Sequence, residues 1–167
     1  MLMNDMKLSG LDYRGTKYYH PGTVGAGVGI TISPDAGDVW MVNALKFHLT
    51  TAVAVANRYV RTYFYGPTGT PPVVVYYPIN FQTAIPASKL AYYFLNSNCQ
   101  YVAGTTIAMT VGTSGADFHS FWRLPEIFLY GNTGGNTSDQ IFIDAVNIQA
   151  ADQFASCHMQ VHWWTQH

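Results

Sequence analysis

The chain has 167 residues, of which 10% are charged and 15% aromatic, and eight Lys and Arg against nine Asp and Glu leave a net charge of −1. An ordinary soluble domain carries about 25% charged residues, so this chain lacks more than half of the usual solvating groups. The length fits one domain, and the scattered basic residues form no phosphate-neutralising patch, which argues against nucleic-acid binding. The composition predicts a surface that is covered by copies of the protein or by neighbours.

The start of the chain and its hydrophobic runs argue against secretion and membrane insertion. Residues 1–7 include Asp5 and have no apolar core, so they do not predict a secretory signal peptide. No run approaches the roughly 18 apolar residues that cross a bilayer. We expect the protein to stay where it is made unless a particle carries it out. Cys99 and Cys157 are expected to be free thiols, because two cysteines do not make a disulfide framework.

Residues 1–22 lack sustained periodicity and contain several turn-forming glycines between scattered aromatic residues. We interpret them as an N-terminal arm that precedes a single β-sandwich domain over residues 23–167. The arm carries Tyr13, Tyr18 and Tyr19. A solvated tail rarely holds so many rings, so we expect the arm to lie on its own domain or on a neighbouring subunit.

Residues 23–32 alternate apolar residues with glycine and predict a strand with one nearly bare face. The Gly-x-Gly-x-Gly pattern over residues 25–29 leads into residues 30–32 and then Pro34. A dinucleotide site needs a helix N-terminus after its glycines to hold phosphate. The pattern therefore does not predict nucleotide binding.

The remaining chain shows the period of two that is typical of strands. Residues 39–50 form the clearest example, and residues 58–65 alternate again, with Arg61, Tyr63 and Tyr65 on one side. Further strand-like stretches occur at residues 73–81, 90–95, 101–111, 118–130, 140–148 and 157–165. Eight or nine strands between turn signals predict an all-β fold, an antiparallel β-sandwich of jelly-roll type, with a Greek-key barrel as the alternative. Residues 88–95 and 145–155 also fit short helices.

The sequence contains no catalytic motif, and we predict that the protein is not an enzyme. Residues 112–115, Gly-Thr-Ser-Gly, lack the spacing of a hydrolase nucleophile elbow. Most carboxylates lie in or beside predicted turns, where Asp commonly caps the backbone. Asp144, within a predicted strand, is the one acid with a position of interest for catalysis.

The histidines do not predict a metal site. His158 and His162 would lie on one face of a strand, about 13 Å apart, which is too far for both to bind one zinc ion. Asp117 and His119 are two residues apart and closer to a usable spacing. We expect these groups to form cross-strand polar pairs or subunit contacts, and we expect no metal and no cofactor.

Adjacent aromatic residues such as Trp163 and Trp164 must face opposite sides of a strand, so half of these rings leave the core of their own domain. Exposed Tyr and Trp anchor protein interfaces and also stack on sugar rings. The expected contact residues are Tyr13, Tyr18, Tyr19, Arg58, Arg61, Tyr63, Tyr65, Trp163 and Trp164.

Three segments, WMVNALKFHLTT over residues 40–51, VANRYVR over residues 55–61 and HMQVHWWT over residues 158–165, resemble small jelly-roll virion proteins of bacteriophages. The resemblance implies a capsid shell or decoration protein that assembles without a cofactor. The first hypothesis is a decoration or cement protein that self-associates, with a trimer as the expected form, and binds other capsid proteins of the head. Such a protein would be assembled in the host cytoplasm and located in the virion. The alternatives are a single-jelly-roll major capsid protein and a carbohydrate-binding or receptor-binding module of a virion fibre.

Overall fold

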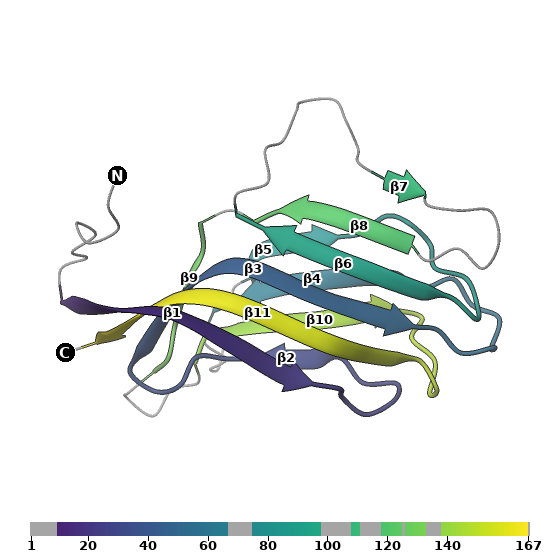
Figure 1. The fold of residues 1–167 in the computed structure, drawn as a ribbon. Helices are drawn as coiled ribbons and strands as arrows, with labels where there is room; N and C mark the ends of the chain where they lie inside the picture. Colours follow the sequence, from purple (N-terminus) through teal and green to yellow (C-terminus); the bar gives the residue numbers. More distant parts are fainter. Residues whose placement is uncertain are drawn as a thin grey trace.

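The computed structural model describes residues 10–66, 75–97, 108–110, 118–124, 126–132 and 138–166. These residues form an all-β, sandwich-like fold of two sheets that face each other (Figure 1). The described part of the chain contains no helix. Residues 88–95 and 145–155 therefore do not adopt the helices that their sequence also allowed.

The larger sheet consists of seven strands, all of them antiparallel to their neighbours except β8, which runs parallel to β6. In sheet order they are β1 (Leu11–Gly22), β11 (Gln153–Gln166), β3 (Asp38–Thr50), β6 (Leu90–Asn96), β8 (Phe118–Arg123) and β7 (Ala108–Thr110), while β9 (Phe128–Tyr130) pairs with the start of β3. In the view of Figure 1 this sheet lies in front.

The smaller sheet has four strands, each antiparallel to its neighbours. Their order is β2 (Ile30–Ile32), β10 (Gln140–Val146), β4 (Tyr59–Tyr65) and β5 (Val75–Asn80). The two sheets are separate, so each has one inner face and one outward face. The two outward faces are the broad surfaces that the sheets leave open.

Residues 23–29 do not form the glycine-faced strand that their alternation predicted, and only residues 30–32 pair, as β2. Gly27 has a φ of 72° and its N–H donates to the carbonyl of Asp152 at 2.7 Å. That backbone conformation belongs to a turn and interrupts a strand. The glycines therefore bend the connection between the sheets.

Residues 11–22 of the expected arm form β1, whose positions alternate strictly between half-buried and exposed. The strand was missed because its alternation uses mixed residues, such as Gly15 and Lys17, and not apolar ones. It pairs with β11 along most of its length, with irregular register near Gly15 and before Gly22. This part of the arm lies on the protein's own sheet. Residues 1–9 are outside the described residues.

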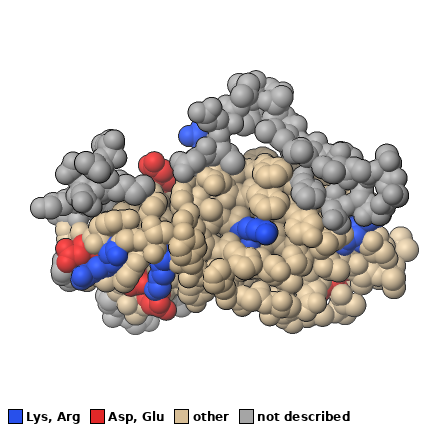
Figure 2. Space-filling view, viewed as in Figure 1, with Lys and Arg blue, Asp and Glu red and all other residues tan. Residues whose placement is uncertain are grey.

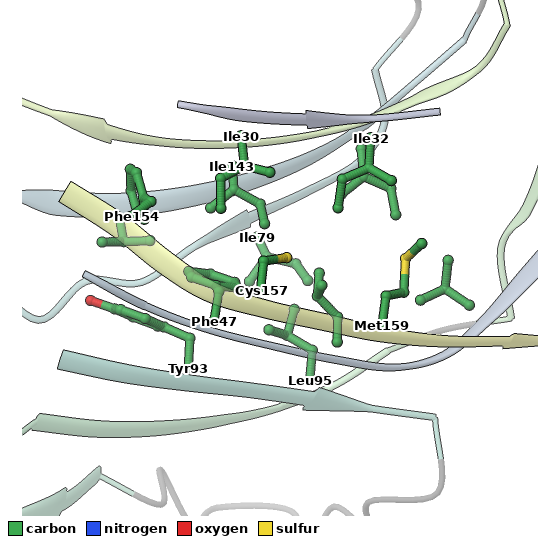
Figure 3. Packing of buried hydrophobic residues seen from close by; sticks show 14 of the residues in the cluster. Ile30, Ile32, Phe47, Ile79, Tyr93, Leu95, Ile143, Phe154, Cys157 and Met159 are labelled. Atoms are coloured by element: carbon green, nitrogen blue, oxygen red, sulfur yellow. The ribbon is translucent and has the colours of Figure 1, made fainter. Parts of the chain in front are cut away.

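The core lies between the sheets and is built by side chains that alternate inward along each strand (Figure 3). Phe47 is fully buried and stacks on Tyr93, with ring centroids 5.0 Å apart. Burial raises the pKa of the Tyr93 hydroxyl well above its usual range. Cys157 is a free thiol in the same core, and burial raises its pKa to about 12. Cys99 is outside the described residues.

Within the described ranges, no helix is long and apolar enough to cross a membrane.

Candidate functional site

An aromatic surface covers the outward face of the smaller sheet. Tyr63 and Tyr65 of β4 stack with ring centroids 5.5 Å apart and planes 23° from parallel. Phe142 of β10 lies opposite Tyr63 in the register, and its ring centroid is 6.3 Å from that of Tyr65. All three rings are half-buried. We call these three residues the aromatic platform.

An ion pair borders the aromatic platform on the same face. Arg61 of β4 and Asp144 of β10 are cross-strand partners whose guanidinium and carboxylate are in contact, with side chains 32% and 20% exposed. The Arg61 guanidinium also lies over the Tyr63 ring, 5.4 Å from its centroid. Asp144, the carboxylate that we singled out from the sequence, is therefore already neutralised by a cation.

The phenol of Tyr65 has a pKa raised by burial and, to a smaller extent, by the neighbouring Tyr63. It therefore remains a neutral hydrogen-bond donor and acceptor at physiological pH. The platform thus combines flat apolar rings with a hydroxyl group and a neutralised ion pair. This arrangement suits binding to another surface more than it suits proton transfer or nucleophilic attack.

The outward face of the larger sheet is also poor in charge. In Figure 2, which shows this face, blue and red atoms are few; several of them adjoin one another at the left end, and the middle of the face is mostly uncharged. Phe94 of β6 and Phe121 of β8 stack here at 5.0 Å, and Lys46 of β3 lies 5.7 Å from the Phe94 ring centroid. His48 packs edge-on against Tyr92 nearby. Burial lowers the pKa of His48, and the charge of Lys46 lowers it further.

Two of the expected contact residues, Arg58 and Trp164, are fully buried within the chain, and we no longer expect them to contact a partner. Arg58 makes a two-pronged ion pair with Asp152, at 2.8 and 2.9 Å. Trp164 does face away from the main core, as adjacency to Trp163 requires, but Tyr13 and Phe128 cover it, with ring centroids 5.3 and 5.8 Å away. Outward direction on a strand did not mean exposure here.

The other expected residues are divided among three places. Arg61, Tyr63 and Tyr65 come together on the smaller sheet, as described above. Tyr18 is 66% exposed on the larger sheet. Tyr13, Tyr19 and Trp163 are half-buried: Tyr13 packs on Trp164, Tyr19 packs on Trp40 at 5.3 Å, and Trp163 lies under the Lys17 ammonium at 4.9 Å.

Sequence reasoning missed two features of these faces. Phe142 alternates with two buried isoleucines in β10, so its outward position could have been read from the sequence. Its approach to Tyr65 depends on the pairing of β10 with β4, which are far apart in the chain. The same is true of His20 and His158, whose Nδ1 atoms are 2.6 Å apart across β1 and β11.

His158 and His162, which the sequence placed too far apart on one strand to share a zinc ion, contact different partners. His162 is 8% exposed, and its Nδ1 is 3.3 Å from the hydroxyl of Thr16 and 3.4 Å from that of Tyr13. His158 instead contacts His20. Among the described residues, no group of three or more His, Cys, Asp or Glu could hold a metal ion. Asp117 and the side chain of His119 lie outside the described part.

The fold and its surfaces define a sandwich-like β protein with two outward faces that are poor in charge and partly aromatic. No protein-family model, curated protein or solved structure matches the chain. Its function is therefore argued from the strand order and from the two faces.

Proposed function

We propose that the protein is a structural component of a bacteriophage virion, a decoration or cement protein that self-associates and binds the head shell. The observation that carries the proposal is the aromatic platform on an open sheet face. Tyrosine is enriched at protein interfaces because its ring is apolar while its hydroxyl remains polar. The adjoining Arg61 and Asp144 neutralise each other, so covering this face leaves no unpaired charge.

The strand order supports a jelly roll within this proposal. The outermost strands in sequence pair with each other, β1 with β11 and β2 with β10, and the inner ones follow, β3 with β6 and β4 with β5. This nesting describes a long two-stranded ribbon that is rolled so that β11 meets β3 and β10 meets β4. Eight strands paired in this way make two four-stranded sheets, with β7, β8 and β9 as additions. Jelly rolls occur in viral capsid proteins, lectin domains and cupins.

A shell-forming capsid protein is the alternative role of the same fold. A shell encloses the genome, and a surface that faces nucleic acid gains affinity by neutralising phosphates. The chain has eight Lys and Arg, and Arg58, Arg61 and Lys17 are committed to ion pairs. This distribution favours a protein on the outside of the head. The protein stoichiometry of purified particles separates the two roles, since a shell protein is the dominant component.

Binding of a carbohydrate is a second candidate function, favoured by the stacked pair of Tyr63 and Tyr65. Stacked or coplanar rings offer an apolar floor to a sugar ring, and Arg61 and Asp144 offer polar atoms at its edge. A glycan array tests this function directly. A glycan signal that disappears in Tyr63→Ala supports it, and an array without signal from a correctly assembled protein rejects it.

The main proposal is tested by the mass of the purified protein in solution. Sedimentation velocity over a range of concentrations should show an oligomer, with a trimer at three times the 18.5 kDa of one chain. Replacing Tyr63 and Tyr65 together by Ala should shift the equilibrium toward the monomer. Tyr18→Ala is the matched control, because it removes an exposed tyrosine from the other sheet.

The proposal also predicts attachment to particles. In a lysate that contains assembled heads, the wild-type protein should sediment with them, and the doubly substituted protein should sediment less because a monomer lacks the multiple contacts of the oligomer. A wild-type protein that is monomeric at high concentration and never sediments with particles would contradict the proposal.

A further inference from the structure

The outward face of the larger sheet contains a shallow depression with a volume of about 290 Å³. It lies over β1, β11, β3 and β6, next to the edge of the sheet that β1 forms. Its polar lining residues are Tyr18, His20, Lys46, Asn96, His158 and Gln160. Among the described residues no carboxylate lines it, and the rest of the lining is apolar, with Ala44, Phe94 and Met159 among its residues. The depression therefore offers hydrogen-bond donors and cations without a competing acid.

His20 and His158 occupy one end of the depression and share a short contact. Their Nδ1 atoms are 2.6 Å apart, and both side chains are exposed. A hydrogen bond between two imidazole nitrogens needs one N–H donor and one lone-pair acceptor. When both rings are protonated, two N–H groups face each other and this bond is lost. Repulsion between the two cations would move the rings apart, and an anionic oxygen could then accept a hydrogen bond from each.

The groups that surround the pair add positive charge. Lys46 of β3 is the cross-strand neighbour of His158, and Arg123 of β8 follows in the next row of the same face. On β1 the next side chain on this face is Tyr18, which pairs with Gln160, and His48 lies further along β3. Strands β6, β8 and β11 contain no Asp or Glu.

The acids of β1 and β3 are both engaged with cations elsewhere. Asp12 lies 3.7 Å from Arg14, and Asp38 lies 3.2 Å from Lys17. Protonation of the histidine pair is therefore not compensated by a carboxylate in these strands. An anion from solution or from another molecule would supply the missing negative charge.

We propose that this depression is a binding site for a carboxylate or phosphoryl oxyanion, held by His20, His158 and Lys46, and that it binds more tightly as the pH falls. The two Nδ1–H groups and the Lys46 ammonium provide three charge-assisted donors, which bind anionic oxygens more strongly than neutral donors do. The inference does not depend on the virion role, because it concerns a different face from the aromatic platform.

Sulfate is the probe for the experiment, since it keeps its double negative charge across the relevant pH range. Binding is measured by titration calorimetry and by the shifts of the histidine ring protons in NMR spectra, at constant ionic strength. Binding is compared at pH 7.5 and at pH 5.5, because histidine is the side chain whose charge changes in this range. We expect sulfate to bind about tenfold more tightly at the lower pH.

Three variants assign the effect to these residues. His158→Gln and His20→Gln should each reduce the pH dependence, because one histidine remains in either variant, and Lys46→Met should weaken binding at both pH values. His48→Gln is the matched control, because it removes a histidine from the same face outside the depression, and it should leave sulfate binding unchanged. All four positions are exposed or half-buried, and circular dichroism checks that the variants are folded.

Further binding measurements distinguish a carboxylate ligand from a phosphoryl ligand. Tighter binding of acetate and of an acidic peptide than of phosphate identifies a partner's carboxylate as the ligand, and the reverse order identifies a phosphoryl group. Sulfate affinity that is equal at both pH values, or that survives His158→Gln, overturns the proposal. Binding of Zn²⁺ to the histidine pair without any binding of sulfate also overturns it.

Discussion

The buried ion pair between Arg58 and Asp152 should be a major source of stability. Both side chains are completely inaccessible to solvent, and the guanidinium meets the carboxylate through Nε and Nη2 at 2.8 and 2.9 Å. The carboxylate also accepts the N–H groups of Ala52 and Gln149, each at 2.7 Å. Asp152 thus ties the connection after β3 to the turn before β11.

Removing one partner of this pair leaves the other as an uncompensated buried charge, which costs about 3–5 kcal/mol. Asp152→Asn and Arg58→Met should each lower the free energy of unfolding by this amount. Because a domain of this kind has about 5–15 kcal/mol in total, either variant would lose a large share of its stability. Combining Arg58→Met with Asp152→Asn should cost less than the sum of the single changes, by about 2–3 kcal/mol.

Urea unfolding followed by tryptophan fluorescence measures these free energies. The control is Arg61→Met, which removes the cation of an ion pair that is partly exposed to water. Such pairs are worth about 0–1 kcal/mol. If Arg58→Met destabilises the protein no more than Arg61→Met does, the reasoning about the buried pair is refuted.

The same pair predicts how stability depends on pH. Burial alone would raise the pKa of Asp152, but the hydrogen bonds from Arg58, Ala52 and Gln149 outweigh it and hold the pKa below its usual value. An acid whose pKa is depressed by folding contributes stability above its unfolded pKa of about 3.9, and this contribution is lost as the pH falls through the folded value. The stability of the wild type should therefore fall below about pH 4 more steeply than that of Arg58→Met.

Three further predictions concern single buried positions. The Cys157 thiol, whose pKa burial raises to about 12, should resist iodoacetamide in the native protein and react after unfolding in guanidinium. Peptide mass spectrometry distinguishes labelling of Cys157 from labelling of Cys99. Labelling of Cys157 in the native protein would contradict its burial. Gly131→Ala should lower the free energy of unfolding in urea by about 2–3 kcal/mol, because a Cβ at this position would lie 1.7 Å from the Asp35 carbonyl oxygen. The control Gly25→Ala should be nearly neutral, because its Cβ would have its nearest contact at 3.9 Å. Asp139→Asn should raise the melting temperature at pH 7. Burial raises the pKa of Asp139 despite a hydrogen bond from the Tyr130 N–H, so its ionisation destabilises the folded protein above the folded pKa, and this cost is relieved as the pH falls through that pKa. An equal gain in melting temperature at pH 3 would contradict this cause.

The alternation of residues was sufficient to predict most strands of the fold. Residues 39–50 and 58–65 form β3 and β4 almost as expected, because their apolar positions repeat every second residue. The rule that adjacent aromatics face opposite sides also holds for Trp163 and Trp164, which pack in two different clusters. Local sequence predicts which face of a strand each side chain occupies, because successive side chains of a strand alternate between its two faces.

The other features of the fold and the site depend on pairing between strands that are distant in the chain, and local sequence patterns do not reveal that pairing. Arg58 looked like a surface residue beside Arg61, but its partner Asp152 lies 94 positions away in the chain. Trp164 is buried only because β1 and β9 bring Tyr13 and Phe128 over it. The glycines of residues 23–29 kept a strand-like alternation although Gly27 has a turn conformation. In each case a long-range contact decided the outcome.

The two outward faces differ in charge, and this difference bears on which face joins identical copies. In a cyclic oligomer, whether a dimer or a trimer, copies of a face that lines the symmetry axis approach one another, so unpaired cations on that face would repel each other. The larger sheet carries Lys46, Arg123 and the histidine pair, whereas on the smaller sheet the Arg61 cation is balanced by Asp144. We therefore infer that copies of the chain meet through the smaller sheet and that the larger sheet meets an acidic partner. Self-association should then be unchanged between pH 5.5 and 7.5 while anion binding changes, and a self-association that weakens together with His158 protonation would assign the contact to the other face.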